Sequence, residues 1–112
     1  MCYESLVVRT KYLQDLGFKI AIDDVGAGYS NFRHIFEIEP DILKLDRSIV
    51  SNIDTSNIKA AFAASIAVFS EKTSSEVIAE GIEREEERIA LINVGITNGQ
   101  GYLFGRPEAW NV

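Results

Sequence analysis

Short apolar runs alternate with segments of helical periodicity along the chain. Four runs have the length of strands and end at Gly, Pro or acidic residues, and they span residues 18–23, 41–46, 76–80 and 96–104. Four other segments repeat apolar residues every three or four positions, as helices do, and they span residues 4–16, 29–36, 58–69 and 83–94. This alternation predicts an α/β fold with parallel strands and right-handed helical crossovers.

The predicted helices carry recognisable terminal signals. Gly17 follows the first helix, where glycine readily adopts the left-handed conformation that ends many helices. Thr55 or Ser56 can cap the helix over 58–69 with a side-chain oxygen. In the first helix we expect one stripe of side chains to pack together, formed by Leu6, Thr10, Leu13 and Leu16.

Polar residues stand at or near the ends of the apolar strands. They are Asp23, Asp24, Lys44, Asp46, Glu80 and Gln100. In a parallel α/β sheet the carboxyl ends of the strands meet along one rim, and ligands bind there. We therefore expect these side chains to gather into one functional site.

Asp23 and Asp24 directly follow an apolar run and precede two glycines, Gly26 and Gly28. Two carboxylates held close repel each other unless a positive charge neutralises them. A hard divalent cation takes oxygen ligands, so the pair favours a metal site. The alternative is a polar strand end followed by a turn, because Asp and Gly both favour turns.

Four further polar residues each allow two interpretations. Lys44, inside a strand, either neutralises a phosphate or orients a water, or else pairs with an acid on a neighbouring strand. Glu80 is a metal ligand or general base, or a helix-capping acid. Glu83 is a weaker candidate than Glu80 for the same role, because acids are common where a helix begins. Gln100 stands between two glycines and either contacts a ligand or is a turn residue. Asp46 is expected to form a strand-end salt bridge or a cap.

Composition narrows the class of protein. The 112 residues suffice for one small domain, and the net charge of −6 argues against non-specific binding to nucleic-acid polymers. The single cysteine, Cys2, suits a reducing compartment, and the first residues lack the pattern of a signal peptide. The apolar stretch 60–69 is too short to span a bilayer. We expect a cytoplasmic protein without a membrane segment.

Four segments in order resemble the motifs of EAL domains, the bacterial cyclic di-GMP phosphodiesterases. Residues 23–30 are similar to DDFGTGYS, and residues 43–48 to LKIDRS. Residues 77–83 are similar to VIAEGVE, and residues 99–107 match GQGYLFGRP. The resemblance extends from about residue 13 to residue 107 and implies a TIM-like barrel.

The resemblance also implies hydrolysis of cyclic di-GMP to the linear dinucleotide with two Mg²⁺ or Mn²⁺ ions. Asp23 would bridge the metals, Asp24 would assist the second metal, and Glu80 would be a metal ligand or base near the attacking water. Two such ions can activate water and stabilise the phosphate together.

Three other residues take supporting roles by the same resemblance. Lys44 would hold the attacking water or a phosphate, while Glu83 and Gln100 would support the active-site loop and the substrate.

The chain carries only the second half of the family pattern. The glutamate of the EAL signature and the ligands of the preceding strands are absent, and four strands cannot close a barrel that normally uses about eight. Unpaired strand edges recruit other strands. We therefore expect residues 1–112 to be the C-terminal (βα)4 half of an EAL-like domain, completed by homodimerisation or by a missing N-terminal half.

Three functions compete at this point. The chain is part of a cyclic di-GMP phosphodiesterase and is inactive alone, or it is a degenerate EAL-like module that binds the nucleotide or a protein partner without catalysis. A phosphorelay receiver domain also has an α/β fold, an acid pair and a lysine. Its order does not fit, because here Lys44 precedes Asp46 and a helix comes first.

Overall fold

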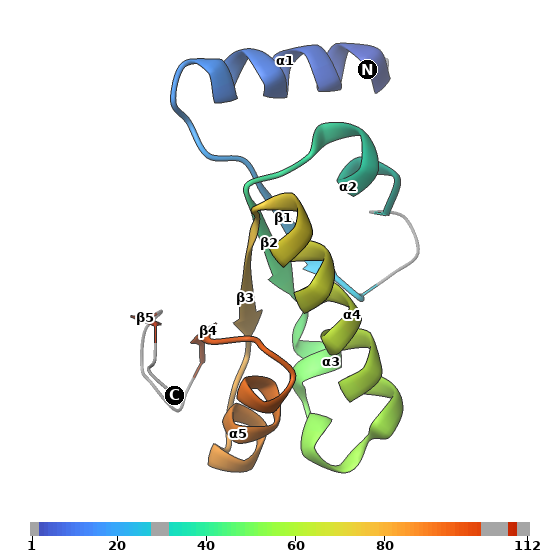
Figure 1. Ribbon diagram of the computed structural model, residues 1–112, viewed down its shortest axis with the longest axis vertical. Helices are drawn as coiled ribbons and strands as arrows, with labels where there is room; N and C mark the ends of the chain where they lie inside the picture. The colour runs from blue at the N-terminus through green and yellow to red at the C-terminus, as the bar shows by residue number, and fades with distance from the viewer. Residues whose placement is uncertain (1–2, 28–31, 102–107, 110–112) are drawn as a thin grey trace.

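The fold is a five-stranded sheet with helices, seen in a computed structural model that describes residues 3–27, 32–101 and 108–109 (Figure 1). The strands follow the chain in the order β1-β2-β3-β4-β5. The first four are parallel, and they are β1 (Ala21–Val25), β2 (Ile42–Leu45), β3 (Glu76–Glu80) and β4 (Asn98–Gln100). The predicted parallel α/β arrangement is confirmed. A short strand that was not predicted, β5 (Glu108–Ala109), pairs antiparallel with β4.

Helical segments precede β1 and connect the parallel strands. They are α1 (Tyr3–Asp15), α2 (Phe32–Ile38), α3 (Arg47–Val50), the 3-10 helix η1 (Ile53–Thr55), α4 (Asn57–Thr73) and α5 (Glu85–Asn93). The expected cap of α4 is confirmed for Ser56, whose side chain accepts a hydrogen bond from the backbone of Lys59. Even α4, the longest described helix, lacks the length and apolar character needed to cross a membrane, and so do the others.

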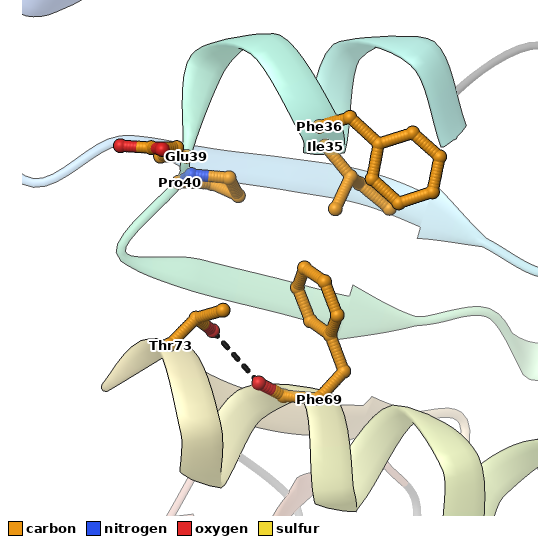
Figure 2. A pocket seen from close by; sticks show the side chains of 6 residues that line it. All are labelled: Ile35, Phe36, Glu39, Pro40, Phe69 and Thr73. Atoms are coloured by element: carbon orange, nitrogen blue, oxygen red, sulfur yellow. Dashed lines mark hydrogen bonds between the residues drawn. The ribbon is translucent and has the colours of Figure 1, made fainter.

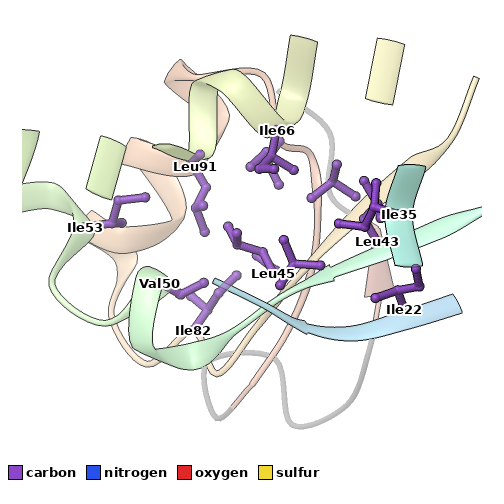
Figure 3. Close-up of a cluster of buried hydrophobic side chains, with 14 residues drawn as sticks. Ile22, Ile35, Leu43, Leu45, Val50, Ile53, Ile66, Ile82 and Leu91 are labelled. Carbon is purple, nitrogen blue, oxygen red and sulfur yellow. The ribbon is translucent and has the colours of Figure 1, made fainter. Parts of the chain in front are cut away.

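Alternate positions of the strands bury one face of the sheet. The buried strand residues are Ile22, Val25, Leu43, Leu45, Val77 and Ala79. They pack in one cluster with Ile35 of α2, Val50 of α3, Ile66 of α4 and Leu91 of α5, so four α-helices share this core (Figure 3). Since successive side chains of a strand point to opposite faces, the residues between them must lie on the other side.

That second side of the sheet is partly or fully exposed, and we call it the open face. Its residues are Ala21, Asp23, Ile42, Lys44, Glu76, Ile78, Glu80, Asn98 and Gln100. Four of the six polar side chains singled out in the sequence, Asp23, Lys44, Glu80 and Gln100, therefore share one face with a few apolar neighbours.

Three of the four predicted strands have different bounds in the structure, and the second covers Ile42–Leu45 instead of 41–46. The first begins at Ala21 instead of 18, because the backbone of Ile20 donates to the side chain of Asp41 before the ladder starts. It also continues to the buried Val25, past the predicted end at 23. The last parallel strand covers only Asn98–Gln100, and the predicted residues 102–104 lie outside the described part of the chain.

The segment after β2 contains two short helices for which the sequence analysis made no prediction, α3 and η1. In α1, the stripe does not reach the core, since Leu13 and the following Leu16 are exposed. The end of the helix is tied to the segment just before β2 through Gln14, whose side chain donates to the backbone of Glu39 and to the carboxylate of Asp41.

The one-sided core gives a stability prediction. Leu45 is fully buried, so Leu45→Ala is expected to lower the free energy of unfolding by about 2–5 kcal/mol through lost burial and a cavity. Leu16 undergoes the same chemical change at a site that is 58% exposed, and Leu16→Ala should cost far less. Urea denaturation followed by circular dichroism measures both, and equal costs would contradict this assignment of the core.

Candidate functional site

A bulge at the end of β1 exposes both aspartates. In the ladder with β2, Asp23 and Asp24 together stand opposite the single Lys44. Asp24 adopts a left-handed backbone conformation with φ 60°, which aspartate tolerates better than most residues. The bulge returns Val25 to the core while leaving two consecutive carboxylates in solvent. A regular strand would have turned one of the two acids under the helices.

Lys44 contacts the first of these acids. Its Nζ lies 3.5 Å from Oδ1 of Asp23, and the two side chains are 33% and 65% exposed. This is one of the two interpretations that the sequence left open for the lysine. An ion pair this exposed contributes about 0–1 kcal/mol, so it leaves the ammonium free to contact a bound anion at little cost.

Glu80, at the end of β3, feels the charges of the neighbouring strand ends. Burial raises the pKa of Glu80 first, and the negative charge of Asp23 raises it further. Lys44 opposes these effects, whereas Asp24 and Asp46 add to them. One carboxylate oxygen, Oε1, is buried without a hydrogen-bond partner among the described residues. Acids from three strand ends therefore converge electrostatically at this rim.

Asp46 has a mainly structural role. Its Oδ2 accepts a hydrogen bond of 2.8 Å from the backbone of Ser48, which caps α3 as the sequence allowed. Hydrogen bonds from Ser48 lower the pKa of Asp46, and a hydrogen bond with the carboxyl group of Asp24 contributes as well. The cap thus fixes the chain directly after β2 and touches the bulge of β1.

Close backbone packing shapes the turn after β3. Gly81 has φ 77°, and a Cβ atom there would approach Nε of Arg47 to 2.8 Å. The N–H of Ile82 donates to the carbonyl of Gln100 at 3.1 Å. Gly101 lies so near the backbone of Ile82 that a side chain would collide with it. These contacts hold Gln100 beside Glu80, its partner in the ladder of β3 and β4.

Glu83 is exposed just before α5, and it is held there by Glu87, a residue that the sequence analysis did not single out. The backbone N–H of Glu83 donates to Oε1 of Glu87 at 3.0 Å, and that of Arg84 donates to the same atom at 3.2 Å. An acid at the third helical position normally signals a capping box when Ser or Thr precedes it by three residues. Here Arg84 occupies that place, so the signal was incomplete.

A model of one protein family, described as EAL domain, matches residues 4–107. The chain belongs to the EAL domain family. The match contains every residue that the sequence analysis assigned to the site, from Asp23 to Gln100.

Curated relatives of this EAL chain are cyclic di-GMP phosphodiesterases. The chain is 38% identical to PdeF of Escherichia coli over 101 residues, which cover 90% of the chain and 14% of PdeF. It is 36% identical to RocR of Pseudomonas aeruginosa over 95 residues, which cover 85% of the chain and 24% of RocR. The chain therefore spans a quarter or less of the length of these two relatives.

Solved EAL structures have the same fold. The complex of Klebsiella pneumoniae BlrP1 with manganese and cyclic di-GMP superposes with a TM-score of 0.87 and 40% identity, over 96% of this chain and 27% of BlrP1. An EAL domain protein from Listeria monocytogenes superposes with a TM-score of 0.79 and 29% identity, over 88% of this chain and 40% of that protein. The EAL chain thus corresponds to part of a larger barrel domain.

The described EAL residues do not form a complete metal site. No three Asp, Glu, His or Cys side chains within 3–27, 32–101 and 108–109 are grouped closely enough to hold an ion. Asp23 and Asp24 reach the rim from the end of β1, and Glu80 reaches it from the end of β3. Gly28 and the rest of that loop, up to residue 31, lie outside the described residues.

A cavity of about 340 Å³ lies elsewhere, between α2 and α4 (Figure 2). It is lined by Ile35, Phe36, Glu39, Pro40, Phe69 and Thr73. These residues stand near the beginning of β2 and far along α4, toward the amino ends of the strands. The acids of the rim are at the opposite ends, so this apolar cavity is separate from the candidate site.

The turn after β3 gives the next prediction. Gly81→Ala forces a side chain into a left-handed backbone and against Arg47, whereas Gly17, with φ 97°, has no neighbour within 4 Å of a Cβ atom. Gly17→Ala should cost about 1–2 kcal/mol from the backbone alone. Gly81→Ala should cost more, and it should shift the amide NMR signals of Glu80 and Ile82. Equal stability losses in urea denaturation would contradict the packing described for this turn.

Proposed function

We propose that this EAL chain is the C-terminal half of a cyclic di-GMP-specific phosphodiesterase domain, which hydrolyses cyclic di-GMP to linear pGpG. The main support is the convergence of Asp23, Lys44 and Glu80 on the open face. The named activity of PdeF and RocR supplies the substrate class, and the manganese of the BlrP1 complex supplies the metal class.

The donor set fits part of a site for Mg²⁺ or Mn²⁺. Asp23, Asp24 and Glu80 offer carboxylate oxygens, which these hard cations prefer, and Oε1 of Glu80 is buried without a described partner. The two aspartates also raise the pKa of Glu80, and a cation held among the three acids would counter that repulsion. When bound, two such ions supply charge neutralisation and an activated water.

The remaining roles in the reaction fall to residues of this chain. The water oxygen bonds to one phosphorus while the bond from that phosphorus to the 3′ oxygen breaks. Glu80 takes a proton from the water as the general base. The 3′ oxygen leaves as a hydroxyl after gaining a proton from solvent. Lys44 neutralises the phosphate, and Glu83 and Gln100 support the substrate and the loop.

The sheet supports the proposal of a half domain. β1 is an edge strand, so its outer backbone groups have no described strand to pair with. The open face also exposes Ala21 beside partly exposed Ile42 and Ile78, which a closed barrel would enclose. We propose that a second copy of the chain, or an N-terminal half domain of a longer protein, covers this edge and supplies the remaining metal ligands.

A second candidate function is binding without catalysis. The absence of a three-acid group among the described residues favours it for the chain alone. Calorimetry with cyclic di-GMP beside a hydrolysis assay separates the two functions. Binding with no turnover, in every assembly that closes the barrel, would favour the degenerate module.

Hydrolysis tests the main proposal. The isolated 112-residue chain with Mn²⁺ should show no turnover of cyclic di-GMP, and joining it to the N-terminal half of an EAL domain should create activity. In that assembly Glu80→Gln should lower kcat by about 10²–10⁴-fold, because the base and a metal oxygen are lost. Glu71→Gln, on the exposed side of α4, is the control and should leave kcat unchanged. An active Glu80→Gln enzyme would contradict the assigned role.

Sedimentation tests how the edge is covered. If a second copy covers β1, the isolated chain should sediment as a dimer. Ala21→Pro should then favour the monomer, because the backbone of Ala21 faces away from β2 and proline removes its donor. If an N-terminal half domain covers β1 in a longer protein, the isolated 112-residue chain should expose apolar surface and bind a hydrophobic dye. A monodisperse monomer that binds no dye would rule against both forms.

A further inference from the structure

Glu87 carries a buried carboxylate that joins two segments of the rim. Its side chain is only 3% exposed. Oε1 accepts hydrogen bonds from the backbone N–H groups of Glu83 and Arg84. Oε2 accepts a hydrogen bond of 2.8 Å from the backbone N–H of Asn52, which lies 35 positions earlier in the chain. One carboxylate therefore connects the turn after β3 to the end of the segment after β2.

The surroundings make this carboxylate costly to move. Val50, Ile53, Ile82 and Leu91 are fully or almost fully buried in the same part of the core (Figure 3). Burial tends to raise the pKa of Glu87, but the three backbone hydrogen bonds and the charge of Arg84 outweigh it and lower the pKa. The group therefore stays ionised inside the protein, where three N–H donors replace water.

Both joined segments carry residues of the site. The turn from Glu80 to Arg84 includes Glu83, and its start is the partly buried Glu80. Asn52 follows α3, the short helix that Asp46 caps directly after β2. Glu83, Arg84 and Asn52 lie outside the sheet, so the ladder alone does not fix them.

An outer set of contacts supports the same junction. Arg84 forms an ion pair of 2.5 Å with Asp54 of η1, and it also donates a hydrogen bond of 3.2 Å to the side chain of Asn52. This pair is more exposed than Glu87, so its contribution is smaller. Arg84 also lies 3.4 Å from Oε2 of Glu87, so it contacts the buried carboxylate itself.

We propose that Glu87 is a positioning residue: by clamping these two segments it holds Glu80 and Glu83 in the arrangement that binds the metal and substrate. The inference rests on the proposed function, and it adds a residue that touches neither metal nor substrate. Hydrogen bonds behind the direct ligands fix ligand orientation, and losing one typically weakens metal binding by about 10–100-fold.

A purely helix-stabilising role is the alternative. Acids in the first turn stabilise a helix through its dipole, and Glu85 and Glu86 occupy the same turn of α5. Glu85, however, pairs with Arg88 on the exposed side of the helix. A matched substitution at Glu85 therefore changes the dipole interaction and leaves the clamp intact.

The test compares Glu87→Gln with Glu85→Gln in the 112-residue chain joined to the N-terminal half of an EAL domain, the assembly in which hydrolysis is measured. After Glu87→Gln, the amide oxygen would still accept from the turn after β3, but the amide nitrogen would face the N–H of Asn52 with another donor. Mn²⁺ titrations followed by paramagnetic broadening of the amide signals of Asp23, Asp24 and Glu80 measure affinity at the rim. Amide hydrogen exchange at Asn52, Glu83 and Arg84 measures the clamp.

We expect Glu87→Gln to weaken rim binding of Mn²⁺ by about tenfold and to accelerate exchange at Asn52, and Glu85→Gln to change neither by more than about twofold. If Glu87→Gln does not fold, Glu87→Asp keeps the charge but is too short to reach both segments, and the same losses are expected. Equal Mn²⁺ affinity in folded variants would overturn the positioning role alone. No broadening in the unaltered assembly would overturn the proposed metal site and this inference together.

Discussion

The alternation of side chains along parallel strands is the constraint on which the structure depends. Each strand sends one set of residues under the helices and the other set to the open face. The buried set is almost purely apolar and supplies the core shared with α2, α3, α4 and α5. The other set is then free to be polar, and at the carboxyl ends it brings together Asp23, Lys44 and Glu80. Stability and chemistry are thereby assigned to opposite sides of the same strands.

Departures from regular geometry gather at the same rim. The bulge at Asp24 breaks the alternation once and adds a second exposed carboxylate. Gly81 adopts a left-handed conformation directly after Glu80, and Gly101 permits the backbone to pass close to Ile82. Strained or closely packed backbone persists where the surrounding structure over-determines it, and such sites are often functional. The buried core beneath the rim, which is fully formed in this chain, provides that support.

The sequence predicted the regular parts well because their signals are local. The strand Glu76–Glu80 was predicted with its observed bounds, since an apolar run there is flanked by acids. The bulge of β1 was not predictable, because Asp24 leaves the strand alternation through a backbone angle rather than through its residue type. The stripe of α1 failed for the opposite reason: its spacing is correct, but the fold leaves Leu16 58% exposed. Periodicity indicates that a helix has an apolar side, and only the surrounding fold decides what covers it.

Contacts between residues far apart in the sequence also limited what could be predicted. The sequence placed Glu80 and Lys44 at strand ends, and parallel topology alone was enough to bring them together. The role of Glu87 could not be predicted, because its carboxylate accepts from Asn52 and no local pattern links residues 35 positions apart. A buried carboxylate satisfied by three backbone donors costs little only when all three are in place. The donors come from two separate segments, so the same interaction that stabilises α5 also fixes how those segments meet at the rim, and stability and site geometry depend on one side chain.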